Sequence, residues 1–220
     1  GAGTNNVTVT WGPAGPGSLS VTEAIVATGC TTTTAPYNVT VNPLPTPVIG
    51  GLNAVCANAA GVVYSTTNVG GHTYVWTISG GAITGGAGTN SVTVTWGGAG
   101  AGTLTVAETI TVTGCTVTTS NYNVTINANP APVISGTTPV CSNQAGVVYS
   151  TPFTAGHSYV WTISGGTITA GAGTNSITVS WGGAGTGTLT VAETIVSSGC
   201  SVTTAPYNVT INPLPTPVIG

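Results

Sequence analysis

The stretch GAGTNSVTVTW, residues Gly86–Trp96, decides the fold of this chain. Within it Val92, Val94 and Trp96 alternate with threonine and serine. Successive side chains of a β-strand point to opposite faces of the sheet, so this alternation places the apolar residues on one face and the hydroxyls on the other. β-Branched residues also suit a half-buried pleated surface. The stretch therefore predicts a strand with its valine and tryptophan side chains turned into a core.

The same stretch recurs along the chain with a constant period of 85 residues. GAGTN begins at Gly1, Gly86 and Gly171, and no insertion or deletion disturbs the spacing. A constant period of this length indicates tandem copies of one structural unit. Other residues keep the same period, namely Trp11, Trp96 and Trp181, Glu23, Glu108 and Glu193, and Cys30, Cys115 and Cys200.

The period divides the chain into domains. Two complete repeats span residues 47–131 and 132–216, residues 1–46 form the C-terminal half of a repeat, and residues 217–220 begin a further one. A unit of this size can bury one small core. The joint Asn212–Pro217 carries alternating prolines, as does its counterpart at residues 42–47, and such a segment is expected to be an extended, semi-rigid spacer.

Further strand patterns surround the first one within each repeat. In the repeat at residues 47–131 they are Gly61–Ser65, Tyr74–Ile78, Thr103–Val112 and Tyr122–Ile126, separated by glycine- and proline-rich turns. No segment shows the 3.6-residue period of a helix. About seven short strands at roughly ten-residue spacing predict an all-β fold, an antiparallel β-sandwich of the Ig-like kind.

The motifs resemble those of a known family. The series GVVYS, YVWTISGG, GAGTNSVTVTWG and YNVTI is similar to the PKD-like, Ig-like repeats of Bacteroidetes cell-surface and secreted adhesin-type proteins. The resemblance implies a PKD-like sandwich for each complete repeat and a location that is extracellular or on a bacterial cell surface. Calcium-binding PKD domains use acidic residues, and this chain has no aspartate, so we expect no metal and no cofactor.

Charge is almost absent from the chain. It has no lysine or arginine, three acidic residues and two histidines. Binding to nucleic acid or to anionic lipid needs basic side chains, so both partners are excluded. No apolar run approaches the ~20 residues needed to cross a bilayer, so membrane insertion is not expected. No basic start followed by an apolar stretch is visible, so we expect a processed chain or a window of a longer one.

Five cysteines suggest disulfides and an oxidising, extracellular setting. One pairing joins cysteines within each repeat, Cys56–Cys115 and Cys141–Cys200, and leaves Cys30 with a partner outside the chain. The other crosses the joints, Cys30–Cys56 and Cys115–Cys141, and leaves Cys200 spare. Loop entropy does not separate the two, but the proline-rich joint favours pairing within repeats. Metal binding is not expected, because no CxxC spacing exists.

The titratable residues offer little catalytic chemistry. Glu108 is in phase with the apolar Leu104 and Val106, which predicts a carboxylate at the inner face, either bonded to backbone N–H groups or protonated. His72 lies in a turn. Catalysis would require glutamate and histidine to converge in a pocket, and a lone carboxylate lacks the partner that acid–base chemistry needs. The equivalent residues are Glu23, Glu193 and His157. We expect no catalytic residue and no enzyme.

Tryptophans and sequons are the remaining candidates. Trp76, Trp96, Trp161 and Trp181 are expected to pack in the cores, although exposed rings could instead form a sugar-stacking platform. Asn-X-Thr sequons mark four candidate glycosylation sites at Asn6, Asn38, Asn123 and Asn208. The last three should point away from the apolar face of their strand.

These observations predict a non-enzymatic structural module of an extracellular stalk, filament or adhesin that supplies length, stiffness and protease resistance. The alternative is a module that binds glycans or a partner protein multivalently, through loops at the sandwich ends or exposed aromatics. The expected partners are neighbouring copies of itself in a fibre or longer array. The half-repeat at residues 1–46 would expose apolar edges. It is either cut from a longer array or covered by strands of a neighbouring chain.

Overall fold

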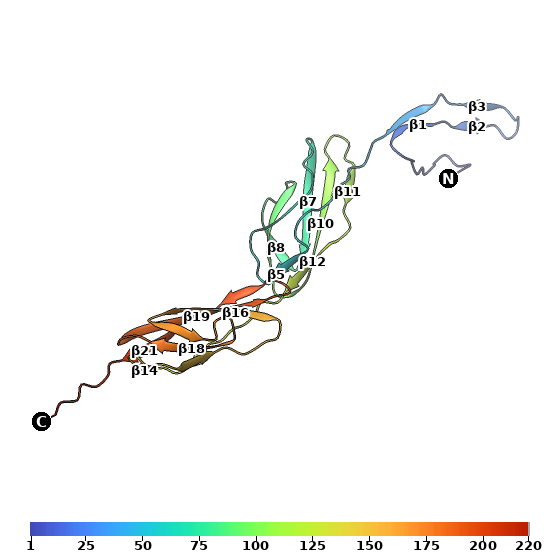
Figure 1. Cartoon of the computed structure of the whole chain (residues 1–220). Coiled ribbons are helices and arrows are strands. Elements are labelled where there is room, and N and C mark those ends of the chain that lie inside the picture. Colours follow the sequence, from blue (N-terminus) through green and yellow to red (C-terminus); the bar gives the residue numbers. More distant parts are fainter. Residues whose placement is uncertain (220) are drawn as a thin grey trace.

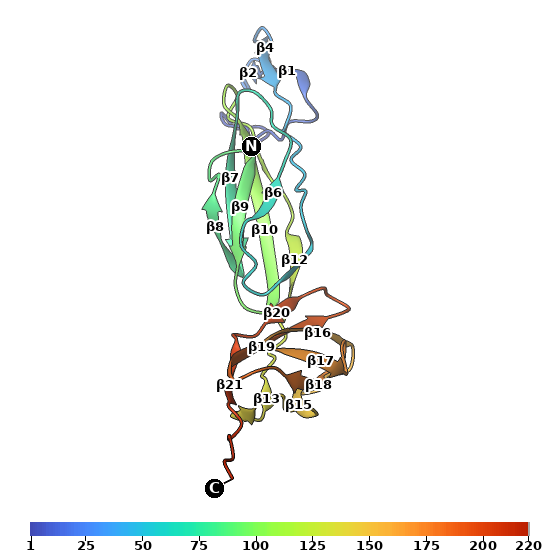
Figure 2. The ribbon, with the colours of Figure 1, turned by 60° about the vertical axis from the view of Figure 1, so that its left-hand side comes forward.

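The computed structural model describes residues 1–219 and places three β-structured units one after another (Figure 1). With the bounds that the 85-residue period predicts, we refer to residues 1–46 as the half-domain, to residues 47–131 as the first domain and to residues 132–216 as the second domain. Every regular element in the described part of the chain is a strand. Both views show the units following one another along the molecule, with the half-domain and the C-terminus at opposite ends (Figure 2).

The first domain is a sandwich of two sheets. At the centre of the larger sheet the long strand β10 pairs with β7 on one edge and with β11 and then β12 on the other. Strand β5 adds to the free side of β12. The strands of this sheet are β5 (Ala54–Cys56), β7 (His72–Ser79), β10 (Gly100–Ile110), β11 (Thr116–Thr118) and β12 (Tyr122–Asn127).

The smaller sheet of the first domain is built around the alternating stretch Gly86–Trp96. Its second half forms β9, which pairs with a strand on either side in the order β6-β9-β8. A bridge from Gly50 to Ser65 extends the free edge of β6. The strands are β6 (Val62–Ser65), β8 (Gly81–Gly85) and β9 (Ser91–Trp96).

The second domain repeats this plan. Strand β19 takes the central place of β10, and β18 takes that of β9. The strands of the larger sheet are β14 (Val140–Cys141), β16 (His157–Ser164), β19 (Gly185–Ile195), β20 (Ser201–Thr203) and β21 (Tyr207–Asn212). Those of the smaller sheet are β13 (Ser135–Gly136), β15 (Val147–Ser150), β17 (Gly166–Ala170) and β18 (Ser176–Trp181).

Each core lies between the two sheets of its domain. In the first domain Val92, Val94 and Trp96 of β9 face Leu104 and Val106 of β10, and all are buried, as the alternation predicts. The all-β sandwich is thus confirmed. One detail differs from a purely antiparallel sandwich, because β5 runs parallel to β12 and β14 runs parallel to β21.

The half-domain contains only strands that are equivalent to strands of the larger sheet. Its strands are β1 (Gly15–Leu19), β2 (Thr22–Ala24), β3 (Thr31–Thr33) and β4 (Tyr37–Val41), and they pair as β1 with β4 and β2 with β3. Together β1 and β2 occupy the repeat positions of β10. Residues 6–11, which correspond to β9, form no strand.

The disulfide differs from both expected pairings. The structure joins Cys56 to Cys200, across the joint and 144 residues apart in sequence, and leaves Cys30, Cys115 and Cys141 as free thiols among residues 1–219. The prediction of pairing within repeats is wrong because of strand length. Cys56 lies beside Asn127 at one end of the larger sheet, whereas the Cys115 carbonyl accepts a hydrogen bond from Ile110 at the other end.

The eleven residues of β10 hold these two ends about 35 Å apart, at ~3.3 Å per residue. A disulfide needs Cα atoms within about 7 Å. The rival pairing of Cys115 with Cys141 fails for the same reason. Cys115 lies at the far end of the first domain and Cys141, beside Asn212, at the far end of the second.

Candidate functional site at the joint between repeats

The joint between the two complete domains is held by asparagine side chains. The chain leaves β12 at Asn127, whose Nδ2 donates to the Val55 carbonyl at 3.2 Å. Asn129 Nδ2 donates to the Ala57 carbonyl at 2.9 Å, and the next residue, Pro130, is buried. The first turns of the linker are therefore fixed against the end of the first domain. Sequence reasoning missed this role, although asparagine recurs with the 85-residue period at residues 42, 127 and 212.

The disulfide is a second covalent connection at this joint. Cys56 ends β5 in the first domain, and Cys200 sits in the turn between β19 and β20 of the second. Their Cα atoms are 5.5 Å apart, and the Cys200 side chain is fully buried. The turn that presents Cys200 is closed by a hydrogen bond of 2.9 Å from the Ile195 amide to the Cys200 carbonyl. The two domains are thus connected both by the linker and by a disulfide bond.

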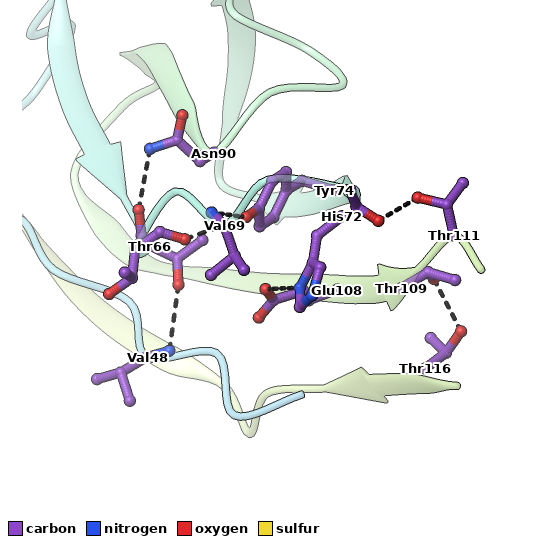
Figure 3. A network of polar contacts seen from close by, with 12 residues as sticks. Val48, Thr66, Val69, His72, Tyr74, Asn90, Glu108, Thr109, Thr111 and Thr116 are labelled. Carbon is purple, nitrogen blue, oxygen red and sulfur yellow. Dashed lines mark hydrogen bonds and ion pairs between the residues drawn. The ribbon is translucent and has the colours of Figure 1, made fainter. Parts of the chain in front are cut away.

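A histidine–glutamate pair lies at the corresponding end of each complete domain. His72 Nδ1 is 2.6 Å from Glu108 Oε1 (Figure 3). The register of β7 against β10 brings them together, because Tyr74 lies opposite Glu108 and His72 is two residues further along the same face. The second domain repeats the pair at the same distance with His157 and Glu193. The sequence predicts a carboxylate bonded to backbone N–H groups or a protonated carboxyl, and the structure pairs Glu108 with a histidine.

The pair lies in a shallow, open pocket under the linker that enters the first domain. Pro45, Thr46, Thr67 and Val69 line it together with the pair. The structure therefore brings together the histidine and the glutamate whose convergence in a pocket catalysis would require. The pairing leaves Glu108 only 3% exposed, and a buried carboxylate is stabilised by such a partner.

Nucleophilic catalysis additionally needs a hydroxyl or thiol within hydrogen-bond reach of the base. Among the hydrogen bonds of residues 1–219, the only partner of the His72 ring is Glu108. The groups around the pair form a structural network instead. The Val69 amide donates to the Tyr74 hydroxyl at 2.9 Å, and the Val48 amide donates to Thr66 Oγ1 at 3.3 Å (Figure 3). This arrangement ties the incoming linker to the domain.

A metal site in a protein takes three or more side-chain ligands. The described part of the chain holds no group of three or more histidine, cysteine or acidic side chains that could ligate an ion.

No helix long and apolar enough to cross a membrane occurs in residues 1–219.

The four tryptophans of the complete domains lie inside the cores. Trp76, Trp96, Trp161 and Trp181 are all buried. Trp96 meets Tyr64 edge to face, with ring centroids 5.8 Å apart, and its Nε1 donates to the Tyr64 hydroxyl at 3.2 Å. Burial raises the pKa of Tyr64, and the hydrogen bond from Trp96 lowers it by a smaller amount. The four rings are therefore not available as a sugar-stacking platform.

The sequon asparagines lie at the surface. Asn6, Asn38, Asn123 and Asn208 are all exposed. The last three alternate with inward neighbours, since Val124 and Val209 are buried beside Asn123 and Asn208. Glycosylation at these positions stays a prediction.

Comparison with known proteins gives one family match. A model of the PKD-like domain matches residues 42–126 and residues 127–211. These boundaries lie five residues earlier than those inferred from the repeat. No curated protein matches the chain.

Several solved structures are similar to this chain at low identity and low TM-score. The fibronectin(III)-like modules of CbhA from Clostridium thermocellum are 11% identical with a TM-score of 0.37, over 76% of this chain and 95% of theirs. The Escherichia coli adhesin FdeC is 15% identical with a TM-score of 0.36, over 94% and 88%. The Bacteroides ovatus protein SGBP-B, solved in complex with a mixed-linkage heptasaccharide, is 17% identical with a TM-score of 0.25, over 91% and 54%.

Proposed function

This chain belongs to the PKD-like domain family, and from that membership we propose that it is a non-enzymatic structural module of an extracellular stalk, filament or adhesin. Its task is to supply length, stiffness and resistance to proteases. The observation that carries the proposal is the joint, where the linker and the Cys56–Cys200 bond connect two sandwiches placed end to end.

Stiffness is supported by the contacts on both sides of the joint. Asn127 and Asn129 hold the linker to the first domain, and the disulfide holds the second domain to the same end. A disulfide between domains suits an oxidising compartment outside the cytoplasm. Protease resistance is supported by composition, since the chain offers trypsin no lysine or arginine.

The non-enzymatic character is supported by the chemistry of each domain. One histidine and one glutamate bond each other and close the end of the sandwich. They form a polar clamp between β7 and β10 and between β16 and β19, a role that needs no substrate.

Surface labelling tests the location. Antibodies raised against the 220-residue chain should label intact, unpermeabilised cells of the organism that produces it. Labelling that appears only after the cells are lysed would contradict an extracellular module.

Stiffness is tested by small-angle X-ray scattering of the oxidised chain. We expect a pair-distance distribution with the long tail of two sandwiches in line. The variant Cys56→Ser provides the matched control and should give a broader distribution, since only the linker then connects the domains. Equal pair-distance distributions for the two proteins would show that the disulfide does not stiffen the joint.

Neighbouring copies of the chain are the proposed partners. The half-domain exposes an apolar face that includes Val7, Leu19 and Val21, and contiguous exposed apolar surface favours association. Sedimentation should show concentration-dependent association of the whole chain. A chain that begins at residue 42 should remain monomeric. If both sediment as monomers at all concentrations, the half-domain does not mediate association.

The alternative function is multivalent binding of a glycan or a partner protein through loops at the sandwich ends. It now depends on those loops, because the core tryptophans are buried. A glycan array probed with the fluorescently labelled chain tests it. Binding would add a recognition role, whereas silence across the array would leave the structural one.

A further inference from the structure

We propose that the Cys56–Cys200 disulfide is a tension lock, which transmits a pulling force from the first domain to the second and keeps the chain between them from extending. The bond closes a loop between cysteines 144 residues apart in sequence whose Cα atoms are only 5.5 Å apart. A force applied to the two ends of the chain follows the shortest covalent path. That path runs to Cys56, crosses the sulfur atoms, and continues from Cys200.

The loop contains most of both domains. Residues 57–199 include β6 to β12 of the first domain and all of the second domain up to β19. None of these strands lies on the covalent path while the bond is intact. Only the strands outside the loop can be drawn out by tension, namely β1 to β5 on one side and β20 and β21 on the other. The linker, which would otherwise carry the whole force, lies inside the loop.

Only this pairing can lock the joint. Cys56 lies at the end of the first domain that faces the second, and Cys200 lies at the facing end of the second domain. A bond within one repeat would have to span the length of β10, about 35 Å at ~3.3 Å per residue. It would also leave the joint outside its loop.

The free thiols Cys115 and Cys141 occupy the same backbone settings as the bonded pair. Ile110 donates to the Cys115 carbonyl at 2.9 Å, as Ile195 does to that of Cys200. Ser142 donates to Asn212 at 2.8 Å, as Ala57 does to Asn127. Each is thus one half of the same link, and its partner is a further PKD-like repeat. Cys141 would bond the late cysteine of a following repeat, and Cys115 the early cysteine of a preceding one.

Formation of each link is an exchange with an oxidised disulfide donor. The two cysteine thiols lose two protons and two electrons to form one S–S bond, and the donor disulfide is reduced to two thiols. In a continuous array the links overlap. Consecutive late and early cysteines, such as Cys30 and Cys56, lie 26 positions apart. The extensible path is therefore short relative to the repeat.

Single-molecule pulling of the 220-residue chain through its two ends tests the lock. The tension lock rests on the proposed function for its biological meaning only. The pulling measurement does not depend on where the protein is located. Fully unfolded, the oxidised chain should be shorter in contour length than the chain reduced with dithiothreitol by about 50 nm. This is the length of the 144-residue loop at ~3.5 Å per residue.

Two variants sharpen the measurement. Cys56→Ser should show the full length without reductant, whereas Cys141→Ser should keep the oxidised length, because that thiol is not part of the bond. If Cys56→Ser does not fold, wild type reduced and alkylated in its place gives the same comparison.

Peptide mapping of the oxidised chain, without reductant, should recover Cys56 linked to Cys200. Equal contour lengths for oxidised and reduced protein would overturn the proposal. So would a length difference of about 40 nm with Cys56 mapped to Cys115 and Cys141 to Cys200, as expected for two separate loops of 59 positions each at ~3.5 Å per residue.

Discussion

The pentapeptide VTVTW occurs twice in this chain with opposite results. At residues 92–96 it forms the centre of the smaller sheet of the first domain, and Val92, Val94 and Trp96 are 0%, 0% and 1% exposed. At residues 7–11 the same letters form no strand, and the corresponding exposures are 55%, 39% and 38%. Identical local sequence, with identical strand propensity, is therefore a strand in one place and an irregular segment in the other.

The difference lies in the partners. In the first domain β9 is hydrogen-bonded to β6 on one edge and to β8 on the other. Residues 1–46 contain no counterpart of β6 or β8, because the corresponding part of the repeat would precede Gly1. Propensity for β structure largely measures packing against neighbours. The alternating pattern thus determines which face is buried, and the partner strands determine whether the strand exists.

Replacing the tryptophan of VTVTW by alanine should give the largest difference in stability loss between the two regions. Trp96→Ala should destabilise the first domain by about 3–5 kcal/mol, because it removes a large buried side chain and leaves a cavity. Trp11→Ala should leave the melting profile nearly unchanged, since its ring is already partly in water. Differential scanning calorimetry can follow both, with the second domain as an internal reference. Comparable losses in the two variants would mean that the half-domain has a packed core.

Removing the histidine should have the next largest effect. His72→Ala leaves the buried Glu108 without its hydrogen-bond partner, and breaking a buried pair costs about 3 kcal/mol or more. In the half-domain Glu23 is exposed and no histidine corresponds to His72. Glu23→Gln is therefore the matched control and should be neutral. Urea denaturation measures both, and an unchanged midpoint for His72→Ala would show that the pair does not stabilise the fold.

A smaller effect is expected for an added methyl group. In Gly102→Ala the new Cβ would come within van der Waals overlap of the Trp96 ring, and that ring cannot move in a full core. Overpacking of this kind costs about 1–3 kcal/mol. Gly17→Ala meets the Trp11 ring in the same way, but an exposed ring can rotate aside. Thermal unfolding should show a clear loss for the first variant and almost none for the second.

The smallest effect is a loss of stability in alkali. Burial raises the pKa of Tyr64 and of Tyr149 in the folded state, whereas an unfolded tyrosine ionises near pH 10. Above pH 10 the unfolded state releases these protons first, so the free energy of unfolding should be constant below that pH and fall above it. Tyr64→Phe should flatten the decline in the first domain, as followed by circular dichroism. If the substitution left the decline unchanged, the loss of stability in alkali would come from ionisable groups other than Tyr64.

Much of this architecture could be predicted from the sequence. The period predicted the two domains and the half-domain, and the alternation in β9 and β10 predicted which side chains are buried, including the carboxylate of Glu108. These features depend on local pattern alone. The pairing of Glu108 with His72 could not be predicted in the same way, because it depends on the register between β7 and β10.

The disulfide shows how a prediction can fail on geometry. The proline-rich linker favours pairing within a repeat over pairing across the joint. The length of β10 separates Cys56 from Cys115 far more, and it places the cysteines of successive repeats together instead. The strand length was readable from the sequence, but the direction of each strand relative to the joint was not.

Residue-resolved hydrogen exchange tests most directly whether partner strands, rather than local sequence, make this fold. The amides of residues 7–11 and 92–96 have the same side chains and thus nearly the same intrinsic exchange rates. We predict strong protection at residues 92–96, and exchange close to the unprotected rate at residues 7–11. Equal protection of the two segments in the monomeric chain would contradict the account, because the pentapeptide would then form a strand without β6 and β8.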